Sequence, residues 1–295
     1  MRTLACVLLL ALALAIQAPV IARQEAGAKP QPPKTPRLYV FDCGLINVNR
    51  AGTERYKVTP EEVGETRFSV PCFLVAHPKG TLMWELGILP DDTVEARARG
   101  EQGNPTATSA AVTTVTRTLT SQLAELGYRP SDITYFAFSH AHVDHNANAD
   151  LFAQSTWLAR PAERAFMWEE GNTRVNRTFF ENIKTSRSIS LDRDEFDVFG
   201  DGTVVLKAAP GHSPGHQVLV LNLPKTGRVM IAGDLYHYPQ ERTMDRYPTF
   251  EFSEPQTRAA RASLETFLKR TGAALWIQHD LTAHAKLKKA PEFYE

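Results

Sequence analysis

The feature that most constrains how this chain can fold is a histidine cluster that directly follows an apolar run at residues 133–138. The cluster reads HAHVDH, so three imidazoles and one carboxylate fall within six positions. Alternation along an extended chain would place His140 and His142 on one side, where both rings could reach one metal ion. Asp144 and His145 follow where the chain must turn, so they could face a second ion beside the first. Solvated histidines gathered by chance explain the cluster poorly, because three of the nine histidines share these six positions.

Three later segments repeat the pattern of polar side chains at the end of an apolar strand. The loop PGHSPGH starts at Pro210, a Gly-Asp pair ends the next strand, and Gln-His-Asp ends the last one. With the first cluster they supply five histidines and two aspartates, enough ligands for two metal ions. Zinc and similar divalent ions favour such a mixture of imidazole and carboxylate. The sequence therefore predicts two divalent ions per chain, with zinc favoured, near His140, His142, Asp144, His145, His212, Asp234 and His279.

Short apolar or alternating runs between turn signals predict a layered α/β fold for the rest of the chain. Residues 109–126 carry apolar positions at helical spacing and end at Gly127, which predicts a helix. A second helix is expected from Glu254 to Arg270, because Ser253 can cap its start and Gly272 follows its end. The predicted strands are residues 38–43, 69–76, 81–85, 133–138, 204–208, 217–223, 229–232 and 274–278.

The N-terminal segment differs from the rest of the chain in composition. Leu4 to Ile16 is an unbroken apolar run of 13 residues, shorter than the roughly 20 that a membrane span needs. Val20 and Ala22 suit a secretory cleavage site after Ala22, with Ala28 as a second candidate. This predicts a signal peptide at 1–22, with an uncleaved anchor as the alternative. A Pro-rich tether is expected at 23–36 and one hydrolase domain at 37–295. We therefore expect an exported protein, periplasmic or extracellular, with no stable membrane association after cleavage.

The balance of charges indicates which kinds of partner the chain can bind. The 33 basic and 33 acidic side chains balance, so the chain lacks the basic footprint of a nucleic-acid binder. A nearly neutral domain suits a small-molecule substrate that is uncharged and partly apolar. The sequence is compatible with a monomer and with a homodimer.

Cleavage would leave Cys43 and Cys72 as the cysteines of the mature protein. An oxidising compartment permits a disulfide between them, whereas cysteines in separate apolar runs are more often buried and free.

The order HxHxDH, PGHSPGH, GD and a final strand-end histidine resembles the metallo-β-lactamase superfamily of dinuclear metal hydrolases. Within it, residues 37–295 are most similar to the N-acyl homoserine lactonases. The resemblance implies a four-layer αβ/βα sandwich, the metallo-β-lactamase fold. It assigns the first metal ion to His140, His142 and His212, the second to Asp144, His145 and His279, and the bridge between them to Asp234.

Two positions depart from the pattern of that family. The family's Asp-x-Gly after an early strand is replaced here by Glu85-Leu86-Gly87, and we expect Glu85 to orient a ligand histidine with its longer side chain. The resemblance implies a tyrosine three residues after the bridging aspartate, a position that contacts the substrate carbonyl in the lactonases. This chain has His237 at that position, with Tyr236 and Tyr238 on either side.

The expected reaction is hydrolysis of a lactone ester, with an N-acyl homoserine lactone as the expected substrate, which would quench quorum signalling. A hydroxide bridging the two ions would attack the carbonyl. Asp144 would shuttle the proton, and Tyr236 or His237 would donate a hydrogen bond to the developing oxyanion. The alternatives are an organophosphate or phosphotriester hydrolase and a broad-specificity ester hydrolase. A β-lactamase and a non-catalytic metal-binding protein rank below them.

We expect the remaining histidines and the aromatic runs to lie outside the set of metal ligands. We expect His216 to support the site rather than bind metal, and His77 and His284 to be solvated. The insert at 88–108 and the aromatic side chains between 166 and 180 could shape a pocket for an acyl chain. Packing in the core explains those aromatic side chains at least equally well.

Overall fold

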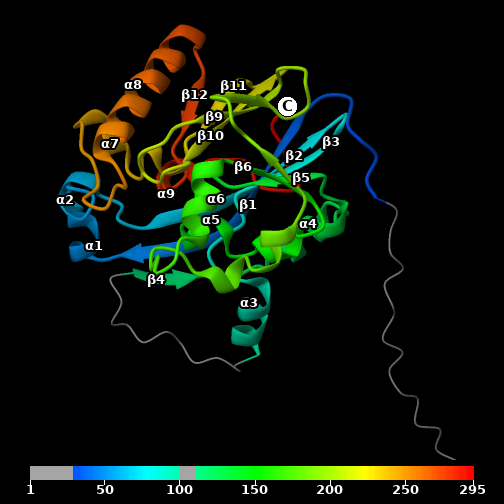
Figure 1. Cartoon of the computed structure of the whole chain (residues 1–295), viewed down its shortest axis with the longest axis horizontal. Coiled ribbons are helices and arrows are strands. Elements are labelled where there is room, and N and C mark those ends of the chain that lie inside the picture. The colour runs from blue at the N-terminus through cyan, green and yellow to red at the C-terminus, as the bar shows by residue number, and fades with distance from the viewer. Residues whose placement is uncertain (1–28, 100–110) are drawn as a thin grey trace, which may run out of the picture.

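The computed structural model describes residues 29–99 and 111–295, which form two β-sheets packed face to face between outer helices (Figure 1). The first sheet has the strand order β4-β1-β2-β3-β5-β6-β7 and the second β12-β11-β10-β9-β8. The strands of the first sheet are β1 (Arg37–Val48), β2 (Phe68–His77), β3 (Gly80–Trp84), β4 (Ala111–Thr114), β5 (Tyr135–Ala137), β6 (Thr156–Ala159) and β7 (Ser188–Ser190). Those of the second are β8 (Glu195–Asp197), β9 (Val204–Ala208), β10 (Gln217–Leu223), β11 (Gly227–Ile231) and β12 (Ala274–Trp276).

Side-chain alternation on β2 explains the layered arrangement. Phe73 and Val75 point into the core between the sheets, whereas Cys72 and Leu74 point to the outer face of the first sheet. There they pack in one cluster with α4 (Leu119–Glu125) and α6 (Pro161–Trp168). The long helix α8 (Glu254–Thr271) covers the outer face of the second sheet (Figure 1). The predicted αβ/βα sandwich is therefore confirmed.

The predicted helix at 109–126 is wrong in its first half. Ala111–Thr114 is instead strand β4, which pairs antiparallel with the end of β1. The run Val-Thr-Thr-Val-Thr explains the difference, because β-branched side chains fit a strand better than a helix. The helix starts only at Leu119, after the Thr118 side chain caps it by accepting from the Ser121 N–H.

The other predicted boundaries hold for some elements and not for others. Strand β1 runs to Val48 rather than to residue 43, and β5 covers only residues 135–137 of the predicted 133–138. Strands β9 and β10 have the predicted bounds, and α8 begins after the Ser253 cap and ends at Gly272 in the left-handed conformation. The shorter helices are α1 (Arg50–Glu54), α2 (Pro60–Val63), α3 (Asp91–Ala98), α5 (Val143–Asn146), α7 (Pro239–Thr243) and α9 (Leu281–His284). The 3-10 turns are η1 (Pro130–Asp132), η2 (Ala149–Phe152), η3 (Arg177–Phe179), η4 (Asn182–Thr185) and η5 (Gly233–Leu235).

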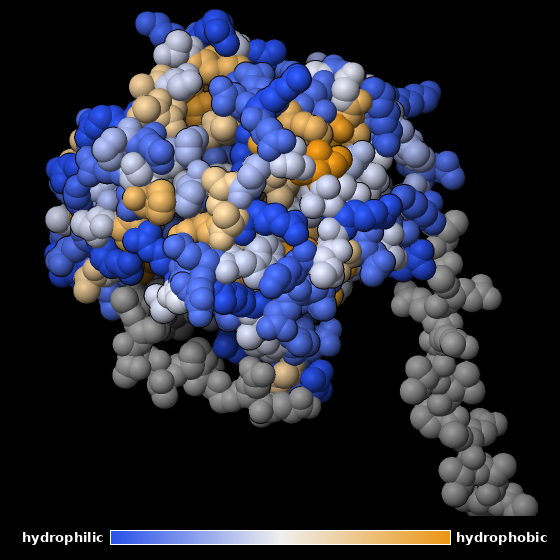
Figure 2. Space-filling model, in the orientation of Figure 1, coloured by the Kyte–Doolittle hydropathy of each residue, from blue (hydrophilic) through white to orange (hydrophobic). Residues whose placement is uncertain are grey.

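The N-terminal predictions fall mostly outside the described residues, which begin at Lys29. The described part of the tether has no helix or strand and contacts the domain: the Lys29 ammonium donates to the Asp132 carbonyl at 2.9 Å. Cys43 and Cys72 form a disulfide between β1 and β2, so the alternative of two free cysteines is wrong. Within the described ranges, no helix combines the length and apolarity needed to cross a membrane. Figure 2 shows a face on which hydrophilic side chains predominate.

Candidate metal centre

The seven candidate ligands come from segments that follow strands of both sheets. His140 and His142 follow β5, and Asp144 and His145 lie in α5 directly behind them. His212 lies between β9 and β10, Asp234 lies in η5 after β11, and His279 follows β12. The structure brings all seven together as two adjacent groups. The ligand atoms within each group lie within 4.8 Å of one another; the groups are His140, His142, His212 and Asp234, and Asp144, His145 and His279.

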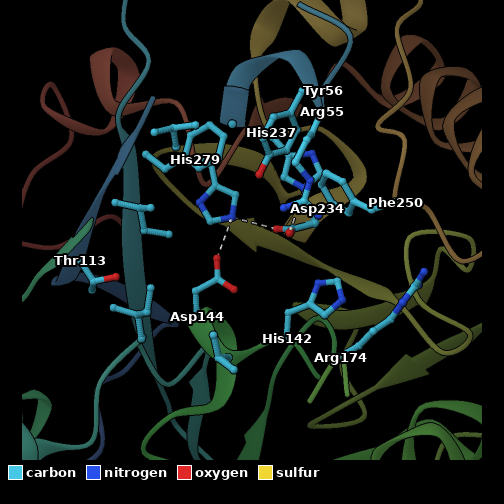
Figure 3. Close-up of a pocket in the computed structure, with 16 residues that line it drawn as sticks. Arg55, Tyr56, Thr113, His142, Asp144, Arg174, Asp234, His237, Phe250 and His279 are labelled. Carbon is cyan, nitrogen blue, oxygen red and sulfur yellow. Dashed lines mark hydrogen bonds and ion pairs between the residues drawn. The ribbon is translucent and has the colours of Figure 1, made fainter. Parts of the chain in front are cut away.

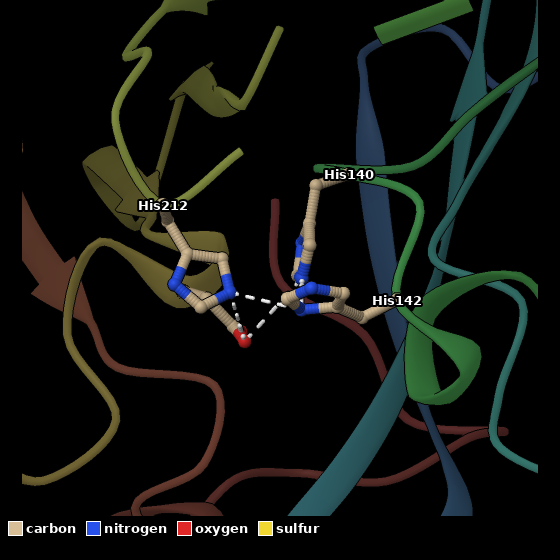
Figure 4. Close-up of side chains that lie close together, drawn as sticks. His140, His142 and His212 are labelled. Carbon is tan, nitrogen blue, oxygen red and sulfur yellow. Dashed lines mark hydrogen bonds and ion pairs between the residues drawn. The ribbon is translucent and has the colours of Figure 1, made fainter. Parts of the chain in front are cut away.

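In the first group, three imidazole nitrogens converge on one point (Figure 4). The Nδ1 atom of His142 lies 2.8 Å from Nε2 of His140 and 3.0 Å from Nε2 of His212. Strand alternation does not produce this arrangement, because β5 ends at Ala137 and both early histidines lie in the loop beyond it. A cation between the three rings would fit this geometry, because each ring presents a nitrogen to the same point.

Asp234 lies between the two groups and divides its carboxylate oxygens between them. Oδ1 is 3.1 Å from Nε2 of His145 and 3.0 Å from Nε2 of His279 in the second group. Oδ2 is 3.3 Å from Nε2 of His212 and 3.5 Å from Nε2 of His140 in the first. The side chain is thus placed to bridge two ions, one in each group.

Two buried polar atoms at this point support a metal site. Nε2 of His145 and Oδ1 of Asp234 are inaccessible to solvent, yet neither forms a hydrogen bond. Buried polar atoms in folded proteins are almost always satisfied. Because Nδ1 of His145 donates to Glu85, its Nε2 is an acceptor like Asp234 Oδ1, and two facing acceptors without a donor need an explanation. A divalent ion bound to both atoms would satisfy them, and imidazole and carboxylate are ligands that zinc accepts. The residues present therefore fit a metal centre.

Polar groups behind the histidines fix how four of the rings face the centre. A ligand histidine in a metal site generally donates its other ring nitrogen to a carboxylate or carbonyl, and that partner sets the orientation of the ring. The expectation that Glu85 orients a ligand histidine is confirmed. The Nδ1 partners are Glu85 for His145 at 3.0 Å, Glu251 for His212 at 3.0 Å, the Ser69 carbonyl for His279 at 2.8 Å and the Ser139 hydroxyl for His140 at 3.0 Å.

The charges of the site keep its two aspartates ionised. Burial alone would raise the pKa of Asp144 and of Asp234, but the facing imidazoles of His145 and His279 outweigh burial and lower both values. Burial, followed by the neighbouring His212, lowers the pKa of His142 to about 3. Two carboxylates and a neutral imidazole are therefore available as ligands near neutral pH.

Glu163 of α6 joins the two loops that carry the first group, and no motif in the sequence indicates this role. Its buried carboxylate accepts from the Ala141 N–H at 2.7 Å, the Ser213 hydroxyl at 2.6 Å and the Gly215 N–H at 2.8 Å. A side chain at Gly215 would collide with Glu163, because its Cβ would lie 2.4 Å from the Glu163 nitrogen. One carboxylate thus holds the HAHVDH segment and the PGHSPGH loop in register.

His216 supports Asp234, as expected. Its Nε2 accepts from the Asp234 N–H at 3.0 Å, and its Nδ1 donates to the Ala209 carbonyl at 3.0 Å. Gly233 is needed just before this point: it has φ +53°, and a Cβ there would lie 2.5 Å from the Cβ of Ser139. These contacts fix the backbone that presents the Asp234 carboxylate.

The structure separates the neighbours Tyr236 and His237. The Tyr236 hydroxyl donates to Glu265 of α8 at 2.9 Å, so it points away from the metal centre and its predicted role as an oxyanion donor is wrong. The alternation of a chain that extends after η5 explains why adjacent side chains face opposite ways. His237 faces the centre, with Nε2 at 3.1 Å from Asp234 Oδ2 and Nδ1 at 3.1 Å from Glu241. Burial would lower the pKa of His237, but the carboxylates of Glu241 and Asp234 raise it to about 10.

Two histidines expected to be solvated are buried instead. His77, at the end of β2, stacks on Phe199 with ring centroids 4.0 Å apart. His284 lies 2.6 Å from the Asp42 carboxylate. Each lies near a chain end or turn in the sequence, but contacts from distant segments cover it. Most of the aromatic side chains between 166 and 180 pack in the core next to the first sheet, so the expectation of core packing is confirmed for them.

A cavity of about 440 Å³ adjoins the metal centre (Figure 3). Sequence reasoning missed two of its polar residues, Arg55 and Tyr56, because they follow the short helix α1 and belong to no motif. Asp144, Asp234, His237, His142 and His279 form the wall at the metal centre. The rest of the lining is Ile46, Val48, Gly52, Arg55, Tyr56, Phe68, Ile88, Thr113, Val143, Arg174 and Phe250.

The chain is similar in sequence and in structure to known proteins. The profile of the Metallo-beta-lactamase superfamily matches residues 66–274. The N-acyl homoserine lactonase AttM of Azorhizobium caulinodans is 29% identical over 264 residues, 88% of this chain and 98% of that protein. A solved N-acyl homoserine lactone hydrolase with N-hexanoyl-L-homoserine at its catalytic metal centre has a TM-score of 0.69 and 21% identity, covering 87% of this chain and 98% of its own. A solved Bacillus thuringiensis AiiA mutant with N-decanoyl-L-homoserine bound has a TM-score of 0.70 and 20% sequence identity, and it covers 87% of this chain and 98% of its own.

Proposed function

The chain belongs to the metallo-beta-lactamase superfamily, and from this membership we propose that it is an exported, dinuclear metal-dependent hydrolase that opens N-acyl homoserine lactones. The observation that carries the proposal is the Asp234 carboxylate, whose two oxygens face two separate groups of histidines. A site for a single ion would not require the two carboxylate oxygens of Asp234 to face different groups of histidines. The similarity to the N-acyl homoserine lactonase AttM extends over almost the full length of that protein. This similarity favours a lactone ester as the substrate.

Two divalent ions, with zinc favoured by the ligand types, are the proposed cofactors. His140, His142 and His212 would hold the first ion, Asp144, His145 and His279 the second, and Asp234 both. Such a pair supplies a hydroxide near neutral pH and polarises the substrate carbonyl.

Side chains of this chain would handle the proton and maintain the geometry. Asp144 lies at the cavity and is partly exposed, so its carboxylate is placed to take a proton from the attacking water and return it to the leaving alkoxide. Water adds across the ester bond, giving one carboxylate and one alcohol in the opened product. His237, held by Glu241, keeps the Asp234 carboxylate in position between the two groups.

The lining of the cavity supports a partly apolar substrate. Ile46, Val48, Phe68 and Ile88 present apolar surface that an acyl chain can cover. The carboxylates among the lining residues are Asp144 and Asp234, both assigned to the metal centre. A cavity of about 440 Å³ lies within the range typical of sites for small molecules.

A phosphotriester or broad-specificity ester hydrolase is the second candidate. The observation that favours it is His237, because the lactonases carry a tyrosine at this position. The two candidates share the metal centre and differ only in the group that is attacked.

Export is part of the proposal and has two supports. The apolar run from Leu4 to Ile16 suits a signal peptide. The disulfide between Cys43 and Cys72 suits an oxidising compartment. Signal cleavage can be tested by N-terminal sequencing of protein recovered from the periplasm or the medium. Full-length protein that stays in the cytoplasm would contradict export.

A substrate panel on zinc-loaded protein tests the catalytic proposal. We expect the highest kcat/KM for N-acyl homoserine lactones, lower values for simple lactones and aryl esters, and little turnover of phosphotriesters and β-lactams. Metal analysis should give two ions per chain. A phosphotriester turned over faster than every lactone would favour the second candidate, and one ion per chain in fully active protein would contradict the dinuclear site.

A further inference from the structure

The hydrogen-bond donors around the cavity differ in whether they are free to meet a substrate. His237 has both ring nitrogens occupied, one by Glu241 at 3.1 Å and the other by Asp234 at 3.1 Å. To donate to a substrate oxygen, it would have to give up its contact with the carboxylate that lies between the two metal groups. A protein hydrogen bond to a substrate carbonyl at the centre would therefore come from another donor, in addition to the polarisation that the metal ions would supply.

Tyr56 offers a hydroxyl that is free for this purpose. It follows α1, where its N–H donates to the Thr53 carbonyl at 2.9 Å, and it lines the cavity beside His237 (Figure 3). Across residues 29–99 and 111–295, the structure gives its hydroxyl no hydrogen-bond partner. A tyrosine hydroxyl without a protein partner, at the edge of a ligand cavity, is available to a bound molecule.

Four surrounding rings hold the Tyr56 ring in place. Phe68, Tyr238 and Phe250 contact it edge-on, with centroids 5.3, 5.4 and 5.2 Å away, and His237 packs against it at 4.7 Å. Edge-to-face contacts of this kind are favourable and restrict rotation of the ring. The hydroxyl is therefore preorganised, which is the property that makes a donor effective in a transition state.

We propose that Tyr56 is a catalytic residue whose hydroxyl donates a hydrogen bond to the carbonyl oxygen under attack. The proposal rests on the proposed function for the nature of the substrate. The O–H bond stays intact throughout, so Tyr56 stabilises the oxyanion without transferring a proton. Burial raises the pKa of the Tyr56 phenol, and the nearby Asp234 and Asp144 carboxylates raise it further, so the donor keeps its proton at neutral pH.

The variant Tyr56→Phe tests this role, because it removes the hydroxyl and leaves the ring packing in place. We expect kcat to fall by about 100-fold, the size of effect seen when one oxyanion donor is removed, while KM changes by less than about threefold. The matched control is Tyr238→Phe. Tyr238 belongs to the same ring cluster, but its hydroxyl donates to the Thr66 carbonyl at 2.8 Å, so kcat should stay near the wild-type value.

A binding measurement provides a readout that does not depend on turnover. The ring-opened acid N-hexanoyl-L-homoserine presents a carboxylate where the substrate presents its carbonyl. Calorimetry on zinc-loaded protein should show about tenfold weaker binding of this acid to Tyr56→Phe, as expected when a hydrogen bond to a charged group is lost. The zinc content of both variants should equal that of the wild type.

The outcomes separate this proposal from the proposed function. A wild-type protein that opens no lactone, but binds the acid in a Tyr56-dependent way, would overturn the proposed function and support the donor. Equal kcat and equal acid binding in Tyr56→Phe and wild type would overturn the donor. Equal losses in Tyr56→Phe and Tyr238→Phe would show that packing of the ring cluster is responsible, and would also overturn the proposal.

Discussion

The wall of the cavity at the metal centre and the wall that faces it are held in place by different forces. The metal wall consists of polar side chains from motifs at strand ends. In the metal centre behind it, polar partners fix the rings of four histidines, His140, His145, His212 and His279. The facing wall consists of side chains from β1, from the segment after α1 and from the loop near Phe250, and it is held mainly by ring and apolar contacts.

This difference predicts how each wall responds to change. A buried carboxylate behind a histidine has a few fixed partners, so its loss leaves unpaired polar groups and costs function steeply. Apolar contacts are less directional, and substitutions of similar size are tolerated with small losses. We therefore expect changes in the metal wall to abolish activity toward every substrate. Changes in the facing wall, apart from loss of the Tyr56 hydroxyl, should alter which substrate is preferred.

The largest effect is expected for Asp234→Ala. Both groups would lose their shared carboxylate, so kcat/KM should fall by at least about 1,000-fold for every substrate, and the zinc content should drop below two ions per chain. The control is Asp201→Ala, which removes a carboxylate beside His77, at the opposite end of β2. Steady-state kinetics and metal analysis measure both effects. An Asp234→Ala protein with full activity and two ions would contradict the bridging role.

A smaller effect on the same wall is expected for Glu251→Gln. This change removes the carboxylate that holds Nδ1 of His212, and such partners are worth about 10- to 100-fold in metal affinity. Competition with a chelator measures the affinity. Glu265→Gln serves as the control, because Glu265 binds Tyr236 and Arg242 on the side of α8. Unchanged zinc affinity in Glu251→Gln would show that the partner of the His212 ring does not need to be charged.

On the facing wall, Val48→Phe should change the substrate preference and leave the metal centre intact. Val48 ends β1 and lines the cavity, so a larger ring there takes space that a long acyl chain would need. We expect KM to rise by about tenfold for a C12 homoserine lactone and to stay unchanged for a C4 one, since one pocket contact is worth about 1–3 kcal/mol. An equal change for both chain lengths would place the acyl chain elsewhere.

The smallest effect is expected for Tyr236→Phe, which lies in neither wall. Its hydroxyl binds Glu265, so its loss should lower the free energy of unfolding by about 1 kcal/mol and change kcat/KM by less than about twofold. Thermal unfolding and kinetics on the best lactone measure the two quantities. A large loss of kcat would show that the side chain turns toward the substrate during the reaction.

Sequence patterns predicted the metal wall far better than the facing wall. His140 and His279 follow apolar strands, and the loops behind strands of one sandwich meet at a common edge, so local pattern and topology agree. Tyr56 gives no such signal, because its place in the cavity depends on contacts with Phe250, about 200 residues further along the chain. The choice between Tyr236 and His237 depended on the backbone direction after η5, which the residue types alone do not encode.

Glu163 has a consequence for where this protein acquires its metal ions. It ties together loops from the two halves of the chain, and each group of ligands likewise draws on both halves. Neither half alone therefore holds a complete set, and the full site exists only after the sheets have docked. A chain exported in the unfolded state would take its ions from the compartment in which it folds. The metal in the native enzyme would then reflect the supply at that destination as well as the ligands themselves.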